Sequence, residues 1–241
     1  MAVATLAERL VANMPLFRPV AREHLAQFLE DAVIHRLKRG GVLLRRGERA
    51  ECFYGVAQGQ LKLTLRGDRG EEKLLRIVAA GETFGEALVF SPRASPIDAV
   101  ALTDAVVVAF PAEQVHALVD RDTNFARAAL SSLSERMHRL VDEIEAETLF
   151  TARQRIASYL VALAKGASRA RLPVTKTLVA SQLGVTKETF SRLLREFADR
   201  GLILVEKRDI LLHDRGRLAA IAHPYPVHPL SDTPVSESSS A

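Results

Sequence analysis

The chain has 241 residues, of which 48% are hydrophobic and 26% charged, the composition of an ordinary globular protein with one or two domains. Its single cysteine, Cys52, excludes an intramolecular disulfide framework and any zinc or iron–sulfur site that needs several cysteines. No apolar run is long enough to span a bilayer, and the N-terminus carries Glu8 and no long apolar stretch, so we expect a cytoplasmic protein without a signal peptide or membrane segment.

Positive charge is concentrated in one part of the chain. The net charge is +4, but residues 151–222 hold 14 Lys and Arg against 6 Asp and Glu, a net of +8, and the rest of the chain has a net of −4. Neutralisation of phosphates supplies most of the non-specific affinity of proteins for nucleic acids. We therefore expect this segment to meet a polyanion, because a merely solvated basic surface would not be confined to one segment.

The first 111 residues predict short helices followed by an antiparallel β-roll. Residues 5–31 have the pattern of short helices. From Ala32 to Pro111, short apolar runs alternate with glycine-containing turns, which is typical of a roll or barrel of short strands. We assign residues 1–111 to a sensor domain and the chain to the α+β class. The predicted strands include Val42–Leu44, Cys52–Tyr54, Leu61–Leu65, Leu74–Val78 and Ala105–Phe110.

A strict helical repeat follows from Thr123 to Thr148. At ~1.5 Å per residue this helix is roughly 39 Å long. We predict a parallel homodimer paired along it and assign residues 112–150 to the dimerisation helix. The alternative is a long helix that lies on its own domain, and Ala129 and Val141 beside the seam favour both roles at once. The apolar residues that step alternately by four and three, as in a coiled coil, are Ala126, Leu130, Leu133, Met137, Leu140 and Ile144.

Residues 175–201 predict two short helices joined at Gly184-Val185. Thr175 and Thr186 are suited to cap the two N-termini, and Gly201 is suited to end the second helix. One face of the second helix is apolar and is formed by Phe190, Leu193, Leu194 and Phe197. The opposite face carries groups that read base edges in a major groove, namely Glu188, Ser191, Arg192 and Arg195.

This arrangement is the helix-turn-helix pattern. The alternative is a pair of surface helices with solvated charges, which the charge excess of residues 151–222 disfavours. A further helix at about Arg153–Lys165 precedes the pair, and a hairpin with the charged tip Lys207-Arg208-Asp209 follows it as a wing expected to lie over backbone phosphate. Residues 151–222 are thus predicted to be a winged helix-turn-helix domain. The tail 223–241, rich in proline and serine, is predicted to be disordered.

Four motifs occur in a characteristic order: Gly47-Glu48, Gly59-Gln60-Leu61-Lys62, Gly81-Glu82-Thr83-Phe84-Gly85-Glu86 and Glu188-Thr189-Phe190-Ser191-Arg192. With the predicted elements, they resemble the CRP/FNR superfamily of bacterial transcription regulators over about residues 15–220. The resemblance implies a cyclic-nucleotide-binding-like β-roll, a DNA-binding homodimer and contact with RNA polymerase. The residues it assigns to DNA are Thr186, Lys187, Glu188, Ser191, Arg192 and Arg195.

The motif E-x-x-S-R resembles the FNR branch of this superfamily. That branch implies a TTGAT-N4-ATCAA-like palindrome, in which Glu188 accepts a hydrogen bond from a cytosine amino group and Arg192 contacts guanine; both pairings agree with base-edge chemistry. The CRP branch has glycine where this chain has Ser191, so a TGTGA-type half-site is not expected.

The sensory side departs from well-known members. The several cysteines that hold the iron–sulfur cluster of FNR are absent, so that cofactor is excluded. Cyclic-nucleotide binders follow Gly-Glu with an Arg-Ser or Arg-Thr pair that holds the phosphate, and without a gap this chain has Pro96-Ile97 there, so cAMP is not expected. A two-residue shift would place Arg93 and Ser95 near these positions, and a cyclic-nucleotide-responsive regulator, or a regulatory module with a protein partner, is the alternative.

The remaining similarity lies in Thr83–Phe90, Arg136–Glu145 and Glu188–Arg192. These segments resemble Dnr-type regulators, which respond to nitric oxide through haem and activate denitrification genes. The implied effector pocket involves Phe84, Gly85, Glu86, Leu88 and His138, with haem as a hypothesis and His138 as its ligand candidate. A solvated histidine on a charged helix is the alternative for His138, and further candidates are His24, His35 and His116. The chain has no G-x-S-x-G, no H-E-x-x-H and no glycine-rich phosphate loop, so we do not expect an enzyme.

Overall fold

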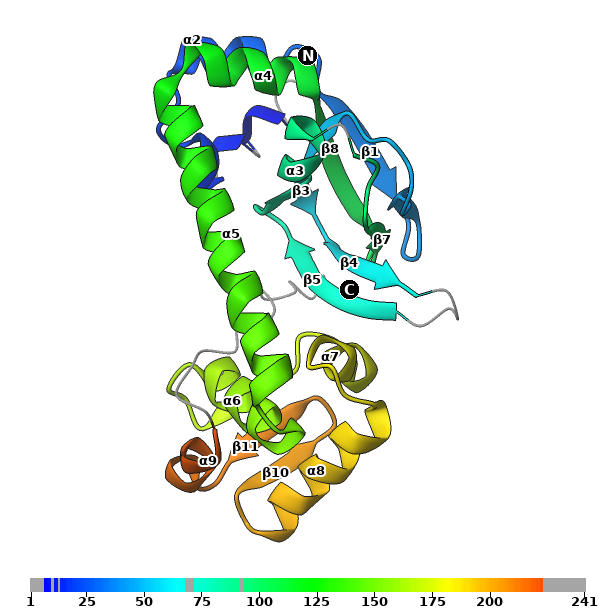
Figure 1. The fold of residues 1–241 in the computed structure, drawn as a ribbon, viewed down its shortest axis with the longest axis vertical. Helices are drawn as coiled ribbons and strands as arrows, with labels where there is room; N and C mark the ends of the chain where they lie inside the picture. The colour runs from blue at the N-terminus through cyan, green and yellow to red at the C-terminus, as the bar shows by residue number, and fades with distance from the viewer. Residues whose placement is uncertain (1–6, 10, 13, 68–71, 92, 223–241) are drawn as a thin grey trace, which may run out of the picture. The chain divides into compact units, whose positions relative to one another are not determined.

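The computed structural model describes residues 7–9, 11–12, 14–67, 72–91 and 93–222. The chain forms two compact units, one reaching Glu135 and the other beginning at Arg136 (Figure 1). None of the described helices combines the length and the apolar character needed to cross a bilayer. The predicted tail, residues 223–241, lies outside the described residues.

The first unit contains two four-stranded antiparallel sheets, with strand orders β1-β8-β3-β6 and β2-β7-β4-β5. All five predicted strands are present. The prediction missed β1, β6 and β7, because β6 has two residues and the other two lack a run of consecutive large apolar side chains. The strands are β1 (Val33–Leu37), β2 (Val42–Leu44), β3 (Cys52–Gln58), β4 (Gln60–Arg66), β5 (Glu72–Ala79), β6 (Thr83–Phe84), β7 (Asp98–Ala101) and β8 (Ala105–Pro111).

Strand β8 is buried on both faces. Val107 and Ala109 belong to the core between the two sheets, and Val108 and Phe110 belong to a second core beneath the helices. This alternation is the period of two that a strand imposes on its side chains. The helices packed over the second core are η1 (Pro15–Phe17), α2 (Arg22–Phe28), α4 (Ala112–Arg121) and the start of α5 (Thr123–Leu149). The short helix α3 (Glu86–Phe90) follows β6.

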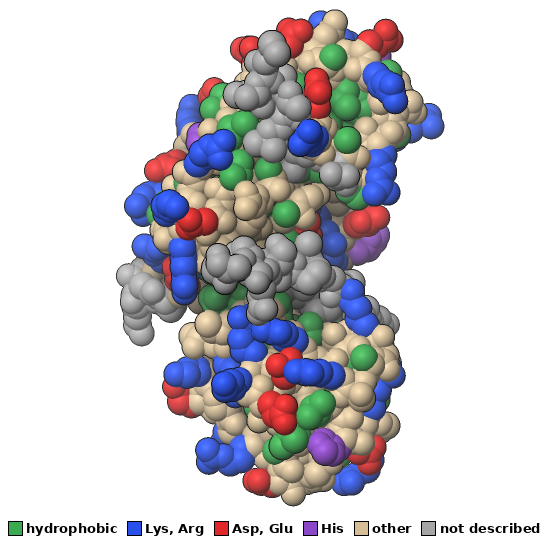
Figure 2. Space-filling model, turned by 180° about the vertical axis from the view of Figure 1, so that it is seen from behind, with side chains coloured by type: hydrophobic (Ala, Val, Ile, Leu, Met, Phe, Trp, Pro, Cys, Tyr) green, Lys and Arg blue, Asp and Glu red, His purple; other side chains and the backbone are tan. Residues whose placement is uncertain are grey.

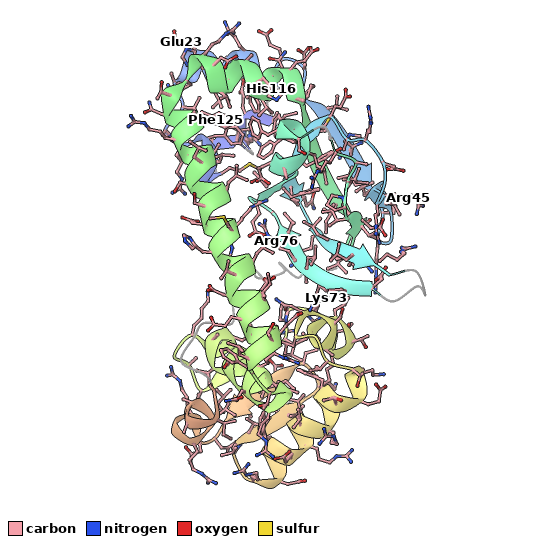
Figure 3. The ribbon with its side chains drawn as sticks, in the orientation of Figure 1. Glu23, Arg45, Lys73, Arg76, His116 and Phe125 are labelled. Carbon is pink, nitrogen blue, oxygen red and sulfur yellow. The ribbon has the colours of Figure 1, made fainter. Side chains whose placement is uncertain are left out.

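Five phenylalanines form the centre of the second core. The ring centroid of Phe17 lies 5.2 Å from that of Phe28 and 5.5 Å from that of Phe125, which Figure 3 labels at the start of α5. Phe28 in turn lies 4.8 Å from Phe110. Phe53 completes the group. These contacts fix the N-terminal helices and the first turn of α5 to the outer face of the β1-β8-β3-β6 sheet.

The segment 112–150, predicted as one dimerisation helix, consists of two helices that break at Asp122. Asp122 has an extended backbone, and its buried carboxylate accepts hydrogen bonds from the backbone N–H groups of Asn124 (3.0 Å) and Phe125 (3.1 Å). A carboxylate at this place satisfies the free N–H groups of a helix start, which is why a new helix begins here. The predicted helix from Thr123 to Thr148 corresponds to α5, which continues from the first unit into the second.

The second unit holds the end of α5, the predicted helix pair and a three-stranded sheet of order β10-β11-β9. Together the units confirm the predicted α+β class. The short strand β9 and the last helix were not predicted. The elements are α6 (Ala152–Ala164), β9 (Arg169–Arg171), α7 (Lys176–Gln182), α8 (Lys187–Asp199), β10 (Ile203–Glu206), β11 (Asp209–Leu212) and α9 (Arg215–Ile221).

Candidate nucleic-acid interface

The two helices of the predicted pair begin at the expected threonines. The Thr175 side chain accepts a hydrogen bond from the backbone N–H of Leu178, and the Thr186 side chain accepts one from the N–H of Thr189 at 3.1 Å. Gly184 in the turn has φ +62°, a left-handed conformation that glycine adopts without strain. These local features set the start of α8 directly after the turn.

Helix α8 has two distinct faces. Its apolar residues Phe190, Leu193, Leu194 and Phe197 are all buried in the second unit. On the other side every residue assigned to DNA is exposed, and within the described part of the chain neither Arg192 nor Arg195 forms an ion pair or a side-chain hydrogen bond. The exposed set is Thr186, Lys187, Glu188, Ser191, Arg192 and Arg195. The helix therefore presents a hydroxyl, a carboxylate and two unengaged guanidinium groups to solvent.

The charged tip of the wing is only partly available for a ligand. Lys207 is exposed at a positive φ of 56° in the turn between β10 and β11. The Arg208 guanidinium instead donates to the Leu172 carbonyl through Nε (3.0 Å) and Nη2 (2.8 Å). Asp209 pairs with Arg169 of the neighbouring strand, at 3.0 Å from Nη2, and this partner lowers the pKa of the carboxyl. Of the three tip residues, Lys207 alone is both exposed and without a partner in the described chain.

A contact that sequence reasoning missed lies at the junction of α5 and α6. The Arg155 guanidinium donates through Nη1 to the carbonyls of Glu147 and Phe150, both at 3.1 Å, and of Ala146 at 3.4 Å. Its Nη2 donates to the Gly184 carbonyl at 3.3 Å. All of these acceptors are backbone atoms, which leave no signature in the amino-acid pattern.

The predicted seam residues of α5 are mostly exposed within one chain. Leu130, Met137, Leu140 and Ile144 have between 53% and 66% of their side-chain surface exposed, and Leu133 is half-buried. Val141 is exposed as well, whereas Ala129 packs into the core of the first unit. A helix thus carries a line of large apolar side chains that its own chain does not cover.

The predicted effector residues are mostly buried in the roll. Phe84 and Leu88 belong to the core between the sheets, with the Tyr54 ring stacked on Phe84 at 5.0 Å. Gly85 has φ +92°, which strains any other residue, and a Cβ there would lie 3.0 Å from a ring carbon of Tyr54, so this position favours glycine. The buried Glu86 carboxylate accepts a hydrogen bond from the Thr83 hydroxyl at 2.9 Å.

The four candidate histidines differ in what their rings contact. His116, labelled on α4 in Figure 3, contacts the Val89 carbonyl through Nε2 at 2.7 Å, and His24 contacts Asp122 through Nδ1 at 2.9 Å. His138 is exposed on α5, in the second unit, and its ring has no hydrogen-bond partner among the described residues. His35 lies half-buried on β1. The described residues contain no group of three or more His, Cys, Asp or Glu side chains arranged to hold a metal ion.

Of the residues considered for holding a nucleotide phosphate, Ser95 is engaged within the roll. Ser95 is buried, and its hydroxyl donates to the Ile97 carbonyl at 2.9 Å. Pro96, at the other alignment, has no N–H to donate. Arg93 is exposed.

Comparison with known proteins matches both parts of the chain to described families. Residues 34–122 match the cyclic nucleotide-binding domain, and residues 154–221 match the Crp-like helix-turn-helix domain. The chain is 26% identical over 220 residues to a CRP-like cAMP-activated global transcriptional regulator of Mycobacterium tuberculosis, covering 88% of this chain and 98% of that protein.

Two solved structures are also similar. FixK2 of Bradyrhizobium japonicum superposes with a TM-score of 0.69 at 22% identity, covering 80% of this chain and 98% of FixK2, which shows a shared fold. The sensor domain of the transcriptional regulator DNR of Pseudomonas aeruginosa is 28% identical with a TM-score of 0.54, covering 63% of this chain and all of that domain.

Proposed function

Because the chain belongs to the CRP/FNR superfamily of DNA-binding transcription regulators, we propose that it acts as a homodimer that reads a TTGAT-N4-ATCAA-like palindrome. One observation carries this proposal: the polar stripe of α8 is exposed and unengaged, while the opposite face of the same helix is buried. In this reading Glu188 accepts from a cytosine amino group, Arg192 donates to guanine O6 and N7, and Ser191 and Arg195 lie beside them in the major groove.

The residues around the stripe supply contacts to the DNA backbone in this proposal. Thr186 and Lys187 stand at the N-terminus of α8, where the helix dipole also favours a phosphate. Lys207 at the tip of the wing faces phosphate beside the groove. Such contacts fix the position of the helix without reading sequence.

The exposed apolar line on α5 supports the dimer. Side chains of this size at coiled-coil spacing are stabilised by burial against an identical helix, at roughly 25 cal/mol per Å² of apolar surface removed from water. Two-fold pairing along α5 then matches a two-fold operator, whose half-sites lie about 34 Å apart when one helical turn separates them. The Mycobacterium tuberculosis and Pseudomonas aeruginosa relatives named above are transcriptional regulators. By analogy with them we assign the chain a cytoplasmic site of action, no catalytic activity and RNA polymerase as a partner.

For the effector, we propose a small molecule at the β-roll that biases the dimer towards the arrangement competent for DNA. The resemblance to Dnr-type regulators makes haem with nitric oxide the first candidate, and the similarity to the DNR sensor domain supports that branch. His138 is the proposed ligand, because imidazole suits iron and its ring is exposed and unengaged among the described residues. The buried residues around Phe84 fill the roll core, so they do not themselves offer a haem pocket in this structure. When bound, haem would supply a site for nitric oxide.

The second candidate is a cyclic-nucleotide-responsive regulator, favoured by the match of residues 34–122 to the cyclic nucleotide-binding domain and by the cAMP-activated relative. Against it, the Ser95 hydroxyl is used within the roll and Pro96 has no donor for a phosphate. Isothermal titration with cAMP separates the candidates: binding that strengthens DNA affinity would favour the nucleotide.

Haemin added to the purified apoprotein provides the matching test. A Soret band that shifts with nitric oxide, and that weakens in His138→Ala but not in His35→Ala, supports haem held by His138. A protein that stays colourless with excess haemin excludes it.

The DNA function itself is tested by fluorescence anisotropy on a TTGAT-N4-ATCAA duplex and on a duplex of the same composition with scrambled half-sites, each with and without the effectors above. Specific sites of this kind are typically bound at least ~10³-fold tighter than non-specific DNA. Equal affinity for both duplexes under every condition would contradict the proposal.

A further inference from the structure

The contacts of Arg155 join three elements of the second unit at one guanidinium group. Arg155 itself lies in the first turns of α6, its Nη1 reaches the last carbonyls of α5, and its Nη2 reaches Gly184 in the turn before α8. A cation at the C-terminal end of a helix is stabilised both by hydrogen bonds to the free carbonyls and by the helix dipole. The bond to Gly184 reaches the turn between α7 and α8, one residue after Leu183, the C-cap of α7, and it links the end of α5 to the turn that precedes the recognition helix.

The connections on both sides of Arg155 are short and have fixed ends. Only Phe150 and Thr151 separate α5 from α6, and Thr151 forms a capping box with Gln154 that fixes where α6 begins. On the other side, Gly184 lies two residues before Thr186, the N-cap of α8. The Arg155 Nε is buried without a hydrogen-bond partner in the described chain. The guanidinium therefore leaves one of its donors unsatisfied in the position that lets Nη1 and Nη2 reach these carbonyls.

From this geometry we infer that Arg155 is a positioning residue: it holds the start of α8 at a fixed angle to the end of α5 and thereby sets which half-site spacing the dimer accepts. The inference rests on the proposed function. Each base pair added between half-sites moves them apart by about 3.4 Å and rotates them by roughly 35° about the duplex axis. A junction fixed by Arg155 does not follow that rotation, whereas a junction without these bonds has a wider range of angles.

Arg153 provides a matched control two residues away. It lies on the same helix and pairs with Glu196 of α8, but no bond joins it to α5 or to the turn in the described residues. Arg153→Met therefore removes an arginine of α6 that contacts the recognition helix and leaves the three-element junction intact. Arg155→Met removes all donors of Arg155 and keeps an unbranched stem of similar packing volume.

The experiment measures affinities of the full-length wild type, Arg155→Met and Arg153→Met for palindromes with N3, N4 and N5 spacers, for a single half-site and for random duplex. We expect wild type and Arg153→Met to lose about tenfold or more when the spacer changes, and Arg155→Met to lose less than about threefold, because bonds from a charged donor correspond to roughly tenfold in an equilibrium. Half-site and random-duplex affinities of Arg155→Met should match wild type, since a half-buried guanidinium occupied by carbonyls contacts no phosphate.

An Arg155→Met spacing profile equal to that of wild type overturns the inference, as does an equal loss at every spacer and at the half-site, which would indicate a purely structural role. If circular dichroism shows that Arg155→Met does not fold, Arg155→Lys decides, because one ammonium group keeps the charge but cannot span α5 and Gly184 together. The affinity of Arg155→Lys should depend less on spacer length than that of wild type. The same dependence as in wild type overturns the inference. A wild type that prefers no palindrome over random duplex overturns the proposed function as well.

Discussion

Arginines of the second unit fall into two groups according to what their guanidinium groups contact. Arg155 and Arg208 donate to backbone carbonyls, and Arg169 pairs with Asp209. Arg192 and Arg195 have no such partner among the described residues and lie exposed on α8. The first group stabilises the unit, and the second is free to bind another molecule. All of these side chains are arginines with the same charge, so residue type alone does not separate the two groups.

Replacing Arg192 with alanine should cost about 1–3 kcal/mol of binding free energy on the specific palindrome and relax preference at one base pair, because two hydrogen bonds to a guanine edge are lost. Anisotropy titrations on palindromes with each substitution at that position measure both effects. Arg217→Ala, an arginine of α9 that pairs with Asp214, is the control and should bind like wild type. Equal loss by Arg192→Ala on random duplex would rule out the base contact.

Asp122 gives a prediction about pH. The pKa of this carboxyl is lowered from 3.8 to about 2. Its contact with His24 is the largest cause, and the backbone N–H groups of Ala21, Phe125 and Asn124 lower it further. Since the folded pKa lies below the unfolded one, the contribution to stability is present above pH 3.8 and is lost as the pH falls through about 2. Asp122→Asn should reduce the free energy of unfolding by ~2 kcal/mol at pH 7, as expected for hydrogen bonds to a charged group, and by much less near pH 2.

Urea unfolding of wild type and Asp122→Asn at several pH values measures this difference in the free energy of unfolding. Asp104→Asn serves as the control, because Asp104 pairs with Lys38 on the surface and its loss should change stability little at any pH. A gap between wild type and Asp122→Asn that is constant from pH 7 to pH 2 would show that the charge of Asp122 has no part in it.

Helices α5 and α8 illustrate how an element can be partly covered by its own chain. On α8 the apolar face is buried within the second unit, and on α5 Phe125 and Ala129 are buried in the first unit. Beyond Ala129 the large apolar side chains of α5 are mostly exposed. In the proposed dimer, a second copy of α5 covers these side chains, because its seam offers the matching surface.

Met137→Asp should separate the dimer into monomers, since it places an unpaired carboxylate in the apolar seam. Light scattering should then report the mass of one chain, 26.4 kDa, in place of twice that mass. Leu149→Asp is the control: Leu149 is an exposed apolar residue of the same helix outside the seam, and its replacement should leave the dimer intact. A dimer that survives Met137→Asp would contradict the seam.

The sequence predicted the elements that carry a clear pattern of apolar side chains. The α8 stripe and the α5 repeat followed from helical periods, five strands of the roll followed from short apolar runs between glycine-containing turns, and both threonine caps were correct. The predicted start of the long helix at Thr123 agrees with the break at Asp122, but α4 was not predicted as a separate helix within residues 112–150. Strands β6 and β9 are too short to show alternation, and the contacts of Arg155 and Arg208 end on carbonyls, which every residue possesses.

Over the whole molecule, the excess positive charge and the aromatic core of the roll lie in different units. The excess of positive charge lies in residues 151–222, and Figure 2 shows Lys and Arg side chains over the lower body, which contains this segment. The roll and its packed aromatic core lie in the other unit, where the net charge is not positive. In the proposed function, the positive unit supplies a salt-dependent attraction to DNA, and the roll supplies the surface for the proposed effector.

Lys207→Gln should weaken binding to palindrome and random duplex alike and reduce the slope of log affinity against log salt by about 1, the value for one phosphate contact. The slope is measured by anisotropy between low and moderate salt. Lys38→Gln, which removes a surface lysine of the first unit, should leave the slope unchanged. A slope that Lys207→Gln leaves unchanged would remove the wing from the DNA contact.

Each unit contains one described tyrosine, and the chain has no tryptophan. Tyr54 lies in the roll, where burial raises its pKa to about 12, and Tyr159 lies in the second unit, where burial raises the pKa of its hydroxyl as well. Neither phenol can ionise readily in alkali until the surrounding core admits solvent. Ultraviolet absorbance of phenolate therefore offers an optical record of the melting of each body without any label, and Tyr54→Phe or Tyr159→Phe assigns each signal to its half of the protein.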